Sequence, residues 1–147
     1  MAAEPEVPLA VYGTLLDAEV RRLVLGRCMG RPAVLHGWER VYVAGEVYPG
    51  IRRREGASVN VTVLRGLGRG ALARADAFEG AEYTREVLPV ACNDNGAAGE
   101  AMVYVPAATV RLTDRPWRYG WAWRSRYRKA FLAMTRAEMA RRGLGKA

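Results

Sequence analysis

Acidic residues gather in one short stretch of the sequence, and their spacing suits proton transfer. Asp76, Glu79, Glu82 and Glu86 all lie in RADAFEGAEYTRE. Asp76 and Glu79 are three residues apart, which places them on one face if the segment is helical. A carboxyl group beside Phe78 and close to a second acid has a raised pKa, as a general acid–base group near neutral pH requires. The alternative interpretation of the same spacing is a solvent-exposed acidic end of a helix.

The other residue types exclude several kinds of active site. His36 is the only histidine, so a Ser-His-Asp triad or a multi-histidine metal site lacks material, and we expect a structural role for it. Cys28 and Cys92 are far apart in the sequence and form no CxxC pair, which predicts free thiols. Neither GxGxxG nor GxxxxGK[ST] occurs. We therefore expect no metal and no cofactor, and carboxylate chemistry assisted by backbone donors.

A glycine turn near the start of the chain is a second candidate feature. In LAVYGTLLD, residues 9–17, an apolar strand leads into a turn at Gly13 and then into a predicted helix. The peptide N–H groups of Gly13, Thr14 and Leu15 precede that helix, where a negative charge is favoured. A simpler interpretation is that Gly13 only permits a tight turn. The turn alone does not decide between the two.

Strands and helices must position these two features. Apolar runs and strict alternation predict strands within 8–15, 33–51, 58–67, 82–92 and 99–106. Helical spacing predicts a helix that begins after Asp17 and stops at Gly26, and a second one that ends near Gly80. Short strands separated by frequent turns favour an α+β domain with a strongly curved or barrel-like sheet.

The chain of 147 residues is expected to form a single domain, 1–147. We expect a loose tail over 1–7, the strand-rich body over about 8–110, and a turn over 93–99 between the last two strands. A C-terminal helical segment is predicted over about 114–142. Asp114 is its expected cap, Pro116 lies in its first turn, and Gly143 stops it.

Composition limits the partners. The net charge of +8 comes almost wholly from arginine, because Lys129 and Lys146 are the only lysines. A basic domain can bind nucleic acid, but the arginines are scattered and no RNA-recognition or zinc-finger signature accompanies them. We expect a basic solvated surface without a nucleic-acid partner. No leader pattern and no membrane-spanning window are evident, so a cytoplasmic protein without a membrane partner is expected. The oligomeric state is not readable.

Three segments share their order and approximate spacing with a known family. They are VYGTLLD, then YPGI about 35 residues later, then ADAFEGAEYTR. Together they resemble the γ-glutamylcyclotransferase-like family, in its AIG2-like branch, whose signatures are Y-G-[ST]-L, a Y/F-P-[AG] element and L-D-x-F-E-G-x-E-Y-x-R. The third segment is the most specific. Its one departure is Ala75 in place of the leucine before Asp76, which loses no charge.

The resemblance implies a fold and a reaction. The implied fold is α+β, a small curved mixed β-barrel with flanking helices and a cavity between the Y-G-T-L turn and the F-E-G segment. In active family members, the free α-amine of a γ-glutamyl substrate attacks its own γ-carbonyl, which leaves 5-oxoproline and releases an amine or amino acid. Because the nucleophile belongs to the substrate, no cofactor is needed and the protein mainly folds the substrate back on itself.

The resemblance also assigns roles to residues. Glu79 is the expected catalytic carboxylate, which takes a proton from the α-ammonium and returns one to the leaving nitrogen. The glycine turn is expected to hold the substrate carboxylate or the developing oxyanion. The expected substrate-binding residues are Tyr12, Gly13, Thr14, Leu15, Pro49, Gly50 and Tyr83. The expected supporting residues are Glu82, Arg85 and Asp76, with Glu82 the competing acid and a candidate ion-pair partner of Arg85.

Other functions stay open at this point. A small-ligand-binding module of the same fold would keep the cavity without turnover, although a binding pocket gains little from burying an unpaired carboxylate such as Glu79. A basic nucleic-acid-binding domain predicts an affinity that falls steeply with salt. Within the enzyme hypothesis the leaving group is open, and a γ-glutamyl amine or amino acid is expected before glutathione.

Overall fold

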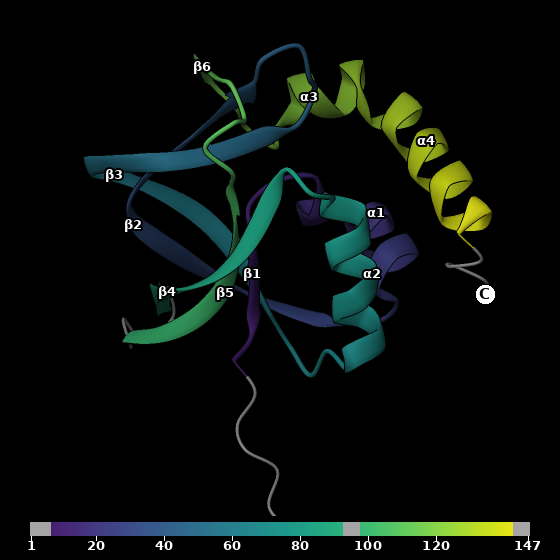
Figure 1. Cartoon of the computed structure of the whole chain (residues 1–147), viewed down its shortest axis with the longest axis horizontal. Coiled ribbons are helices and arrows are strands. Elements are labelled where there is room, and N and C mark those ends of the chain that lie inside the picture. The colour runs from purple at the N-terminus through teal and green to yellow at the C-terminus, as the bar shows by residue number, and fades with distance from the viewer. Residues whose placement is uncertain (1–6, 93–97, 143–147) are drawn as a thin grey trace, which may run out of the picture.

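Strands close into a barrel, and helices pack along one side of it (Figure 1). The computed structural model of the chain describes residues 7–92 and 98–142. Residues 1–6 of the tail expected over 1–7, most of the turn expected over 93–99 and the stop at Gly143 therefore lie outside the described residues. The strands are β1 (Leu9–Val11), β2 (Met29–Val43), β3 (Pro49–Arg65), β4 (Tyr83–Cys92), β5 (Ala98–Pro106) and β6 (Leu112–Pro116).

Closure comes from the pairing of the first five strands. Their order is β3-β1-β5-β4-β2, and β2 pairs again with β3. The pairing of β1 with β5 is parallel, whereas β1–β3, β2–β3, β2–β4 and β4–β5 are antiparallel. The expectation of an α+β fold with a small mixed β-barrel and flanking helices is confirmed.

The first two α-helices begin or end at the residues that the sequence signals. They are the 3₁₀ turn η1 (Thr14–Leu16), α1 (Ala18–Leu25), α2 (Arg69–Glu79), α3 (Trp121–Arg126) and α4 (Arg128–Arg141). Asp17 caps α1, and Gly26 and Gly80 end α1 and α2 with φ of 78° and 76°, a backbone region that favours glycine. None of the described helices is long and apolar enough to span a bilayer.

The long strands β2 and β3 differ from the expected boundaries. The sequence predicts a break between two strands at the basic stretch after Ile51, yet β3 runs without a break from Pro49 to Arg65. Polar side chains are accommodated in this part of the β2–β3 pair because each lies opposite a partner on the neighbouring strand. Arg52 lies opposite Glu39 and donates to its carboxylate at 2.7 Å, and Arg53 covers the ring of Trp38, its cross-strand neighbour.

The predicted start of the C-terminal helical segment is wrong. Leu112–Pro116 forms β6, which pairs with the edge of β2, and the first helix of this segment begins only at Trp121. An open strand edge favours such pairing because its backbone groups need partners. Asp114 is therefore not a helix cap, and its carboxylate instead accepts a hydrogen bond from Arg52 at 2.9 Å.

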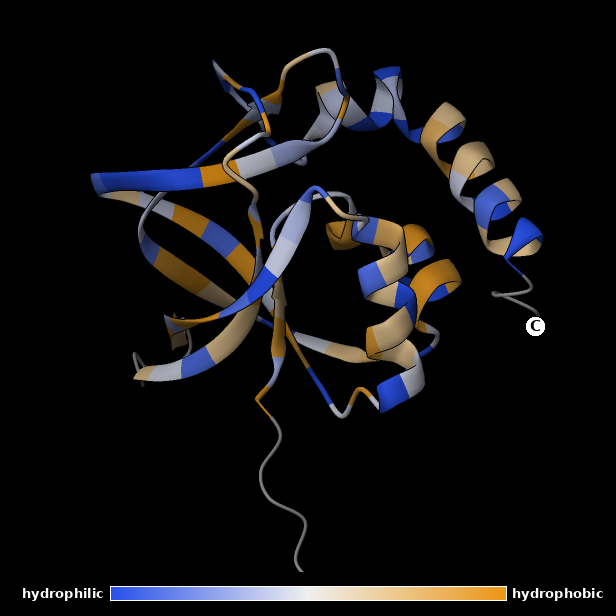
Figure 2. Cartoon of the chain, in the orientation of Figure 1, coloured by the Kyte–Doolittle hydropathy of each residue, from blue (hydrophilic) through white to orange (hydrophobic). Residues whose placement is uncertain are grey.

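Buried side chains form two clusters, one inside the barrel and one between the barrel and the helices. Hydrophobic and hydrophilic residues alternate along the long strands (Figure 2), which turns one face of each strand inward. Leu35, Ile51 and Val103 belong to the inner cluster. Leu64 and Trp123 belong to the outer cluster, which joins α1, α2 and α4 to the barrel. The free thiols of Cys28 and Cys92 are confirmed, and both are half-buried.

Asp17 ties the glycine turn to the C-terminal helices. Its fully buried carboxylate accepts the peptide N–H groups of Glu19 and Val20 at the start of α1. It also accepts the Tyr119 hydroxyl at 2.8 Å and the Arg128 guanidinium at 2.6 Å. Burial alone raises the pKa of Asp17, but the hydrogen bonds from Arg128, Tyr119 and Val20 outweigh it and lower the pKa below its usual value.

Replacing Asp17 by alanine is expected to lower the free energy of unfolding at pH 7 by about 3 kcal/mol, because a helix cap and a buried ion pair are lost together. Since the folded-state pKa of Asp17 is depressed, this stability is present above the usual aspartate pKa and is lost as pH falls through the folded value. Urea unfolding at pH 7 and pH 3 measures both effects.

The matched control is Asp114→Ala, because Asp114 also pairs with an arginine but its side chain is 98% exposed. Screening by solvent leaves little net stabilisation in such a pair, so this variant should unfold with the parent protein. Equal losses in the two variants would contradict the role assigned to Asp17.

Candidate active site

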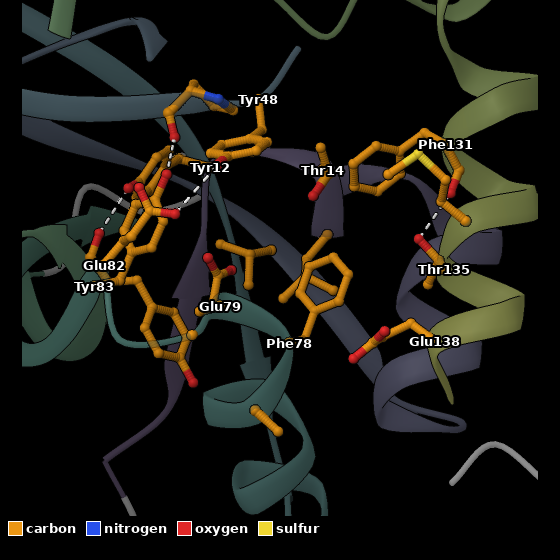
Figure 3. Close-up of a pocket in the computed structure, with 18 of the residues that line it drawn as sticks. Tyr12, Thr14, Tyr48, Phe78, Glu79, Glu82, Tyr83, Phe131, Thr135 and Glu138 are labelled. Atoms are coloured by element: carbon orange, nitrogen blue, oxygen red, sulfur yellow. Dashed lines mark hydrogen bonds between the residues drawn. The ribbon is translucent and has the colours of Figure 1, made fainter. Parts of the chain in front are cut away.

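A cavity of about 680 Å³ lies between the barrel and the helices. One wall is the turn after β1, residues 12–15, together with Tyr48 and Pro49 at the start of β3. Another wall is the end of α2 and the start of β4, residues 77–80 and 82–83, with Tyr104 of β5. The side chains of α4, among them Phe131 and Thr135, face this wall across the cavity (Figure 3).

Most of the residues predicted from the sequence meet in this cavity. Those that line it are Tyr12, Gly13, Thr14, Leu15, Pro49, Glu79, Glu82 and Tyr83. Gly50, Asp76 and Arg85 do not line it. The expectation for Gly50 is corrected by its packing, because a Cβ atom there would lie 2.7 Å from side-chain atoms of both Leu112 and Pro106, behind the wall.

Glu79 occupies the middle of the cavity (Figure 3). It is the last residue of α2, and the helix ends there because Gly80 follows. Within residues 7–92 and 98–142, no hydrogen bond or ion pair engages the Glu79 carboxylate. Burial, with a smaller contribution from the negative charge of Asp76, raises the pKa of Glu79 to about 8. Protonated and ionised forms therefore coexist close to neutral pH, as an acid–base group requires.

Asp76 has the opposite environment, although it lies on the same helix. Its carboxylate accepts Arg85 Nε at 2.7 Å and Nη2 at 3.1 Å, and it also accepts the Tyr104 hydroxyl at 2.7 Å. The candidate ion pair of Arg85 with Glu82 is thus wrong, since the partner of Arg85 is Asp76. The two acids of α2 divide their roles, because Asp76 is paired outside the cavity and Glu79 is unpaired inside it.

A group of tyrosines surrounds one end of the cavity, and their hydroxyls are already engaged. Tyr12 donates to the carbonyl of Tyr104 at 2.7 Å, and Tyr83 donates to the carbonyl of Pro49 at 2.8 Å. Tyr48 donates to Glu82 over a longer 3.4 Å. Burial and nearby carboxylates raise the pKa of Tyr48 to about 12, so its hydroxyl stays neutral.

Glu82 is a weaker candidate than Glu79 for the acid–base role. It is exposed at the rim of the cavity, whereas Glu79 lies in the middle (Figure 3). His36 is also exposed and does not line the cavity. No three His, Cys, Asp or Glu side chains among the described residues lie close enough together to hold a metal ion.

The glycine turn, residues 12–15, lines the cavity. The N–H groups of Leu16 and Asp17 donate to the carbonyls of Gly13 and Thr14, which forms η1. Among the hydrogen bonds of the described residues, none takes up the N–H groups of Gly13, Thr14 and Leu15. The only cations among the described lining residues are Arg141 and Arg142 at the end of α4. An anion at the turn would therefore rely on peptide N–H groups.

Gly13 is required for space. Its φ of −117° is available to any residue. A Cβ atom at Gly13 would lie 3.0 Å from Cγ of Pro49, tighter than ordinary van der Waals contact. The small residue therefore lets the turn approach the start of β3, so two of the matched segments meet at this contact.

Several lining residues escape prediction from the sequence. Tyr48 belongs to the YPGI segment, and its place beside Pro49 is the one signal that points to it. Tyr104 joins the site only through barrel closure, 28 residues from its partner Asp76. The face of α4 with Phe131, Met134 and Thr135 has no motif that marks it as a cavity wall.

Comparisons with known proteins agree on one family. The family described as gamma-glutamyl cyclotransferase, AIG2-like, matches residues 9–124. Protein AIG2 C of Arabidopsis thaliana is 34% identical over 96 residues, which are 65% of this chain and 58% of that protein. AIG2-like protein C of the same plant is 33% identical over 144 residues, 95% of this chain and 81% of that protein.

A solved structure named gamma-glutamyl cyclotransferase shares the fold of this chain. The two superpose with a TM-score of 0.62 over 73% of this chain and 68% of that chain, at 17% identity.

The unusual pKa of Glu79 predicts a pH-dependent effect of Glu79→Gln on stability. The folded-state pKa is raised, so ionisation of Glu79 destabilises the native protein progressively as pH rises from the usual glutamate value to about 8. Glutamine cannot ionise. The variant should therefore gain stability over the parent as pH rises from 5 to 9, by roughly 4 kcal/mol at the upper end.

Urea unfolding across this pH range measures the gain, and Glu82→Gln at the rim is the matched control. Glu82→Gln removes a carboxylate from the exposed rim of the same cavity. A stability difference for Glu79→Gln that stays flat with pH, or a gain of the same size in Glu82→Gln, would contradict the effect of burial on Glu79.

Proposed function

This chain belongs to the gamma-glutamyl cyclotransferase, AIG2-like family, and we propose that its cavity cyclises a γ-glutamyl amine or γ-glutamyl amino acid to 5-oxoproline. The α-amine of the substrate forms a bond to the carbon of its own γ-carbonyl group, and the bond from that carbonyl carbon to the leaving nitrogen breaks. The observation that carries the proposal is the unpaired Glu79 carboxylate in one cavity with the peptide donors of the glycine turn.

The cavity suits the two charged ends of a γ-glutamyl group. The N–H groups of Gly13, Thr14 and Leu15 are available to the α-carboxylate or to the oxyanion that develops on the γ-carbonyl. The carboxylate of Glu79 favours the α-ammonium. When both ends of the substrate are held, the γ-glutamyl group bends, which brings the amine near the γ-carbonyl carbon and removes most of the entropic barrier.

Glu79 moves the protons. Its ionised form takes a proton from the substrate ammonium, so that the nitrogen lone pair becomes free to attack the γ-carbonyl carbon. The resulting carboxylic acid returns a proton to the leaving nitrogen as the second bond breaks. A pKa of about 8 makes both transfers accessible near neutral pH, because neither form is strongly favoured.

The leaving group has room toward α4. The rings of Phe78 and Phe131 pack edge to face, with their centroids 6.2 Å apart. Together with Met134 they line that part of the cavity. An amine or amino acid released from the γ-carbonyl carbon would depart along this wall. The family match ends at residue 124, before α4 begins.

The test is incubation of the protein with a panel of γ-glutamyl amines, γ-glutamyl amino acids and glutathione, with 5-oxoproline followed by mass spectrometry. At least one compound should be converted. Glu79→Gln should reduce kcat by a factor of about 100 or more, the usual contribution of a general acid–base group. The parent enzyme should show kcat/KM rising with pH through an apparent pKa near 8, because the base must be ionised.

Glu82→Gln is the control, since it removes an acid from the same cavity and leaves Glu79 in place. It should keep most of the parental rate. If Glu79→Gln turns over at the parental rate while Glu82→Gln is inactive, the acid has been assigned to the wrong residue. If compounds bind and none is converted, the protein is a ligand-binding module of this fold.

A further inference from the structure

Arg40 lies directly behind the glycine turn, outside the cavity lining. It projects from β2, and its Nη1 donates to the carbonyl of Tyr12 at 2.8 Å. Its Nε donates to the carbonyl of Trp117 at 2.9 Å, and its guanidinium lies over the Trp117 ring, 5.3 Å from the centroid. A longer contact of 3.4 Å joins Nη1 to the carbonyl of Asn60. One side chain thus connects β2 and β3 with the turn and the chain after β6.

The charge of Arg40 has no counter-ion among the described residues, which sets it apart from Arg52, Arg85 and Arg128. Its partners are backbone carbonyls, which satisfy its N–H groups and leave the net charge in place. Burial, and then the nearby charge of Arg118, lowers the pKa of Arg40 to about 10, so it remains a cation at neutral pH. A half-buried cation without a partner produces a positive potential that water screens poorly.

The contact with Tyr12 transmits this potential to the cavity. The carbonyl that Arg40 binds belongs to the peptide between Tyr12 and Gly13, and the N–H of that peptide is the first donor of the turn. In a trans peptide the carbonyl and the N–H point in opposite directions. A cation on the carbonyl therefore directs the N–H away from Arg40 and polarises it into a stronger donor.

We propose that Arg40 is a positioning residue, which orients the Tyr12–Gly13 peptide and supplies the positive potential that binds the α-carboxylate of the substrate. This inference rests on the proposed function. It assigns to a residue outside the cavity the selectivity for a free carboxylate, as opposed to an uncharged amide of the same shape. The lining around the turn has no cationic side chain among its described residues to provide that selectivity.

The experiment compares two ligands that differ only in this charge, a γ-glutamyl amine and the same compound with its α-carboxylate converted to a carboxamide. Binding is measured by titration calorimetry in the Glu79→Gln background, where turnover does not interfere. The protein with Arg40 should prefer the carboxylate by about tenfold or more, equivalent to about 1.4 kcal/mol. Arg40→Gln keeps an N–H donor without the charge and should bring the two affinities close together.

Two further variants separate charge from structure. Arg40→Lys keeps the cation and should keep most of the preference for the carboxylate. This variant still tests the inference if Arg40→Gln fails to fold. Arg74→Met is the matched control, because Arg74 also donates to two backbone carbonyls, those of Val24 and Leu25, and does not line the cavity. It should lose stability and keep the full preference for the carboxylate.

Three results would overturn the inference. They are an unchanged preference in Arg40→Gln, an equal loss of affinity for both ligands, and a loss of the preference in Arg40→Lys. The readout is independent of turnover.

Binding and turnover together separate this inference from the proposed reaction. A carboxylate preference that depends on Arg40, in a protein that forms no 5-oxoproline, would refute the proposed reaction alone. If the protein forms 5-oxoproline but the preference for the carboxylate is the same with and without Arg40, this inference alone is refuted. If neither ligand binds, the inference and the proposed reaction are both refuted.

Discussion

The short strand β1 is the constraint on which the site depends. Its residues, Leu9–Val11, are all buried, and they pair with β3 on one side and with β5 on the other, which closes the barrel. The chain leaves β1 directly into the glycine turn, so barrel closure fixes where the peptide donors lie. Asp17 then holds the far end of the turn against α4 through Arg128. A turn that would be mobile on an open sheet is thereby fixed at both ends.

A second organising feature is that some of the acidic side chains have hydrogen-bond and ion-pair partners and one in the cavity has none among the described residues. Asp17 and Asp76 both have arginine and tyrosine partners, and Asp17 is the one of the two that is buried. Glu79 has neither among the described residues, and its charge is disfavoured where it stands. A carboxylate held in this way lowers stability at high pH and gains proton affinity. Functional sites commonly contain groups that lower the stability of the fold and have a shifted pKa suited to proton transfer.

Much of this arrangement could be predicted from the sequence, because local signals specify it. The cap at Asp17, the glycine stop at Gly80 and the alternation in the strands are short-range patterns, and the structure confirms them. The gathering of Glu79 with the glycine turn followed from the family motifs, since no spacing rule joins segments that are 60 residues apart.

The sequence-based predictions that were wrong or missing share a different cause, because they depend on contacts between segments far apart in the sequence. The partner of Arg85 depends on how β4 crosses α2, and helix spacing does not determine that crossing. Residues Leu112–Pro116 contain a helix-start signal, yet the open edge of β2 captures them as a strand. The wall formed by α4 depends on how that helix docks, and its sequence carries no motif. Sequence reasoning brought Glu79 together with the glycine turn and missed the wall of the cavity that α4 forms.

The most direct measurement is a crystal structure of Glu79→Gln with a γ-glutamyl amine bound. The α-carboxylate should accept hydrogen bonds from the N–H groups of Gly13, Thr14 and Leu15, with the γ-carbonyl carbon and α-amine beside residue 79 and the leaving amine toward α4. A ligand bound in the reverse direction, with its α-carboxylate at Arg141 or Arg142 and its amine far from residue 79, would contradict the proposed reaction at this site.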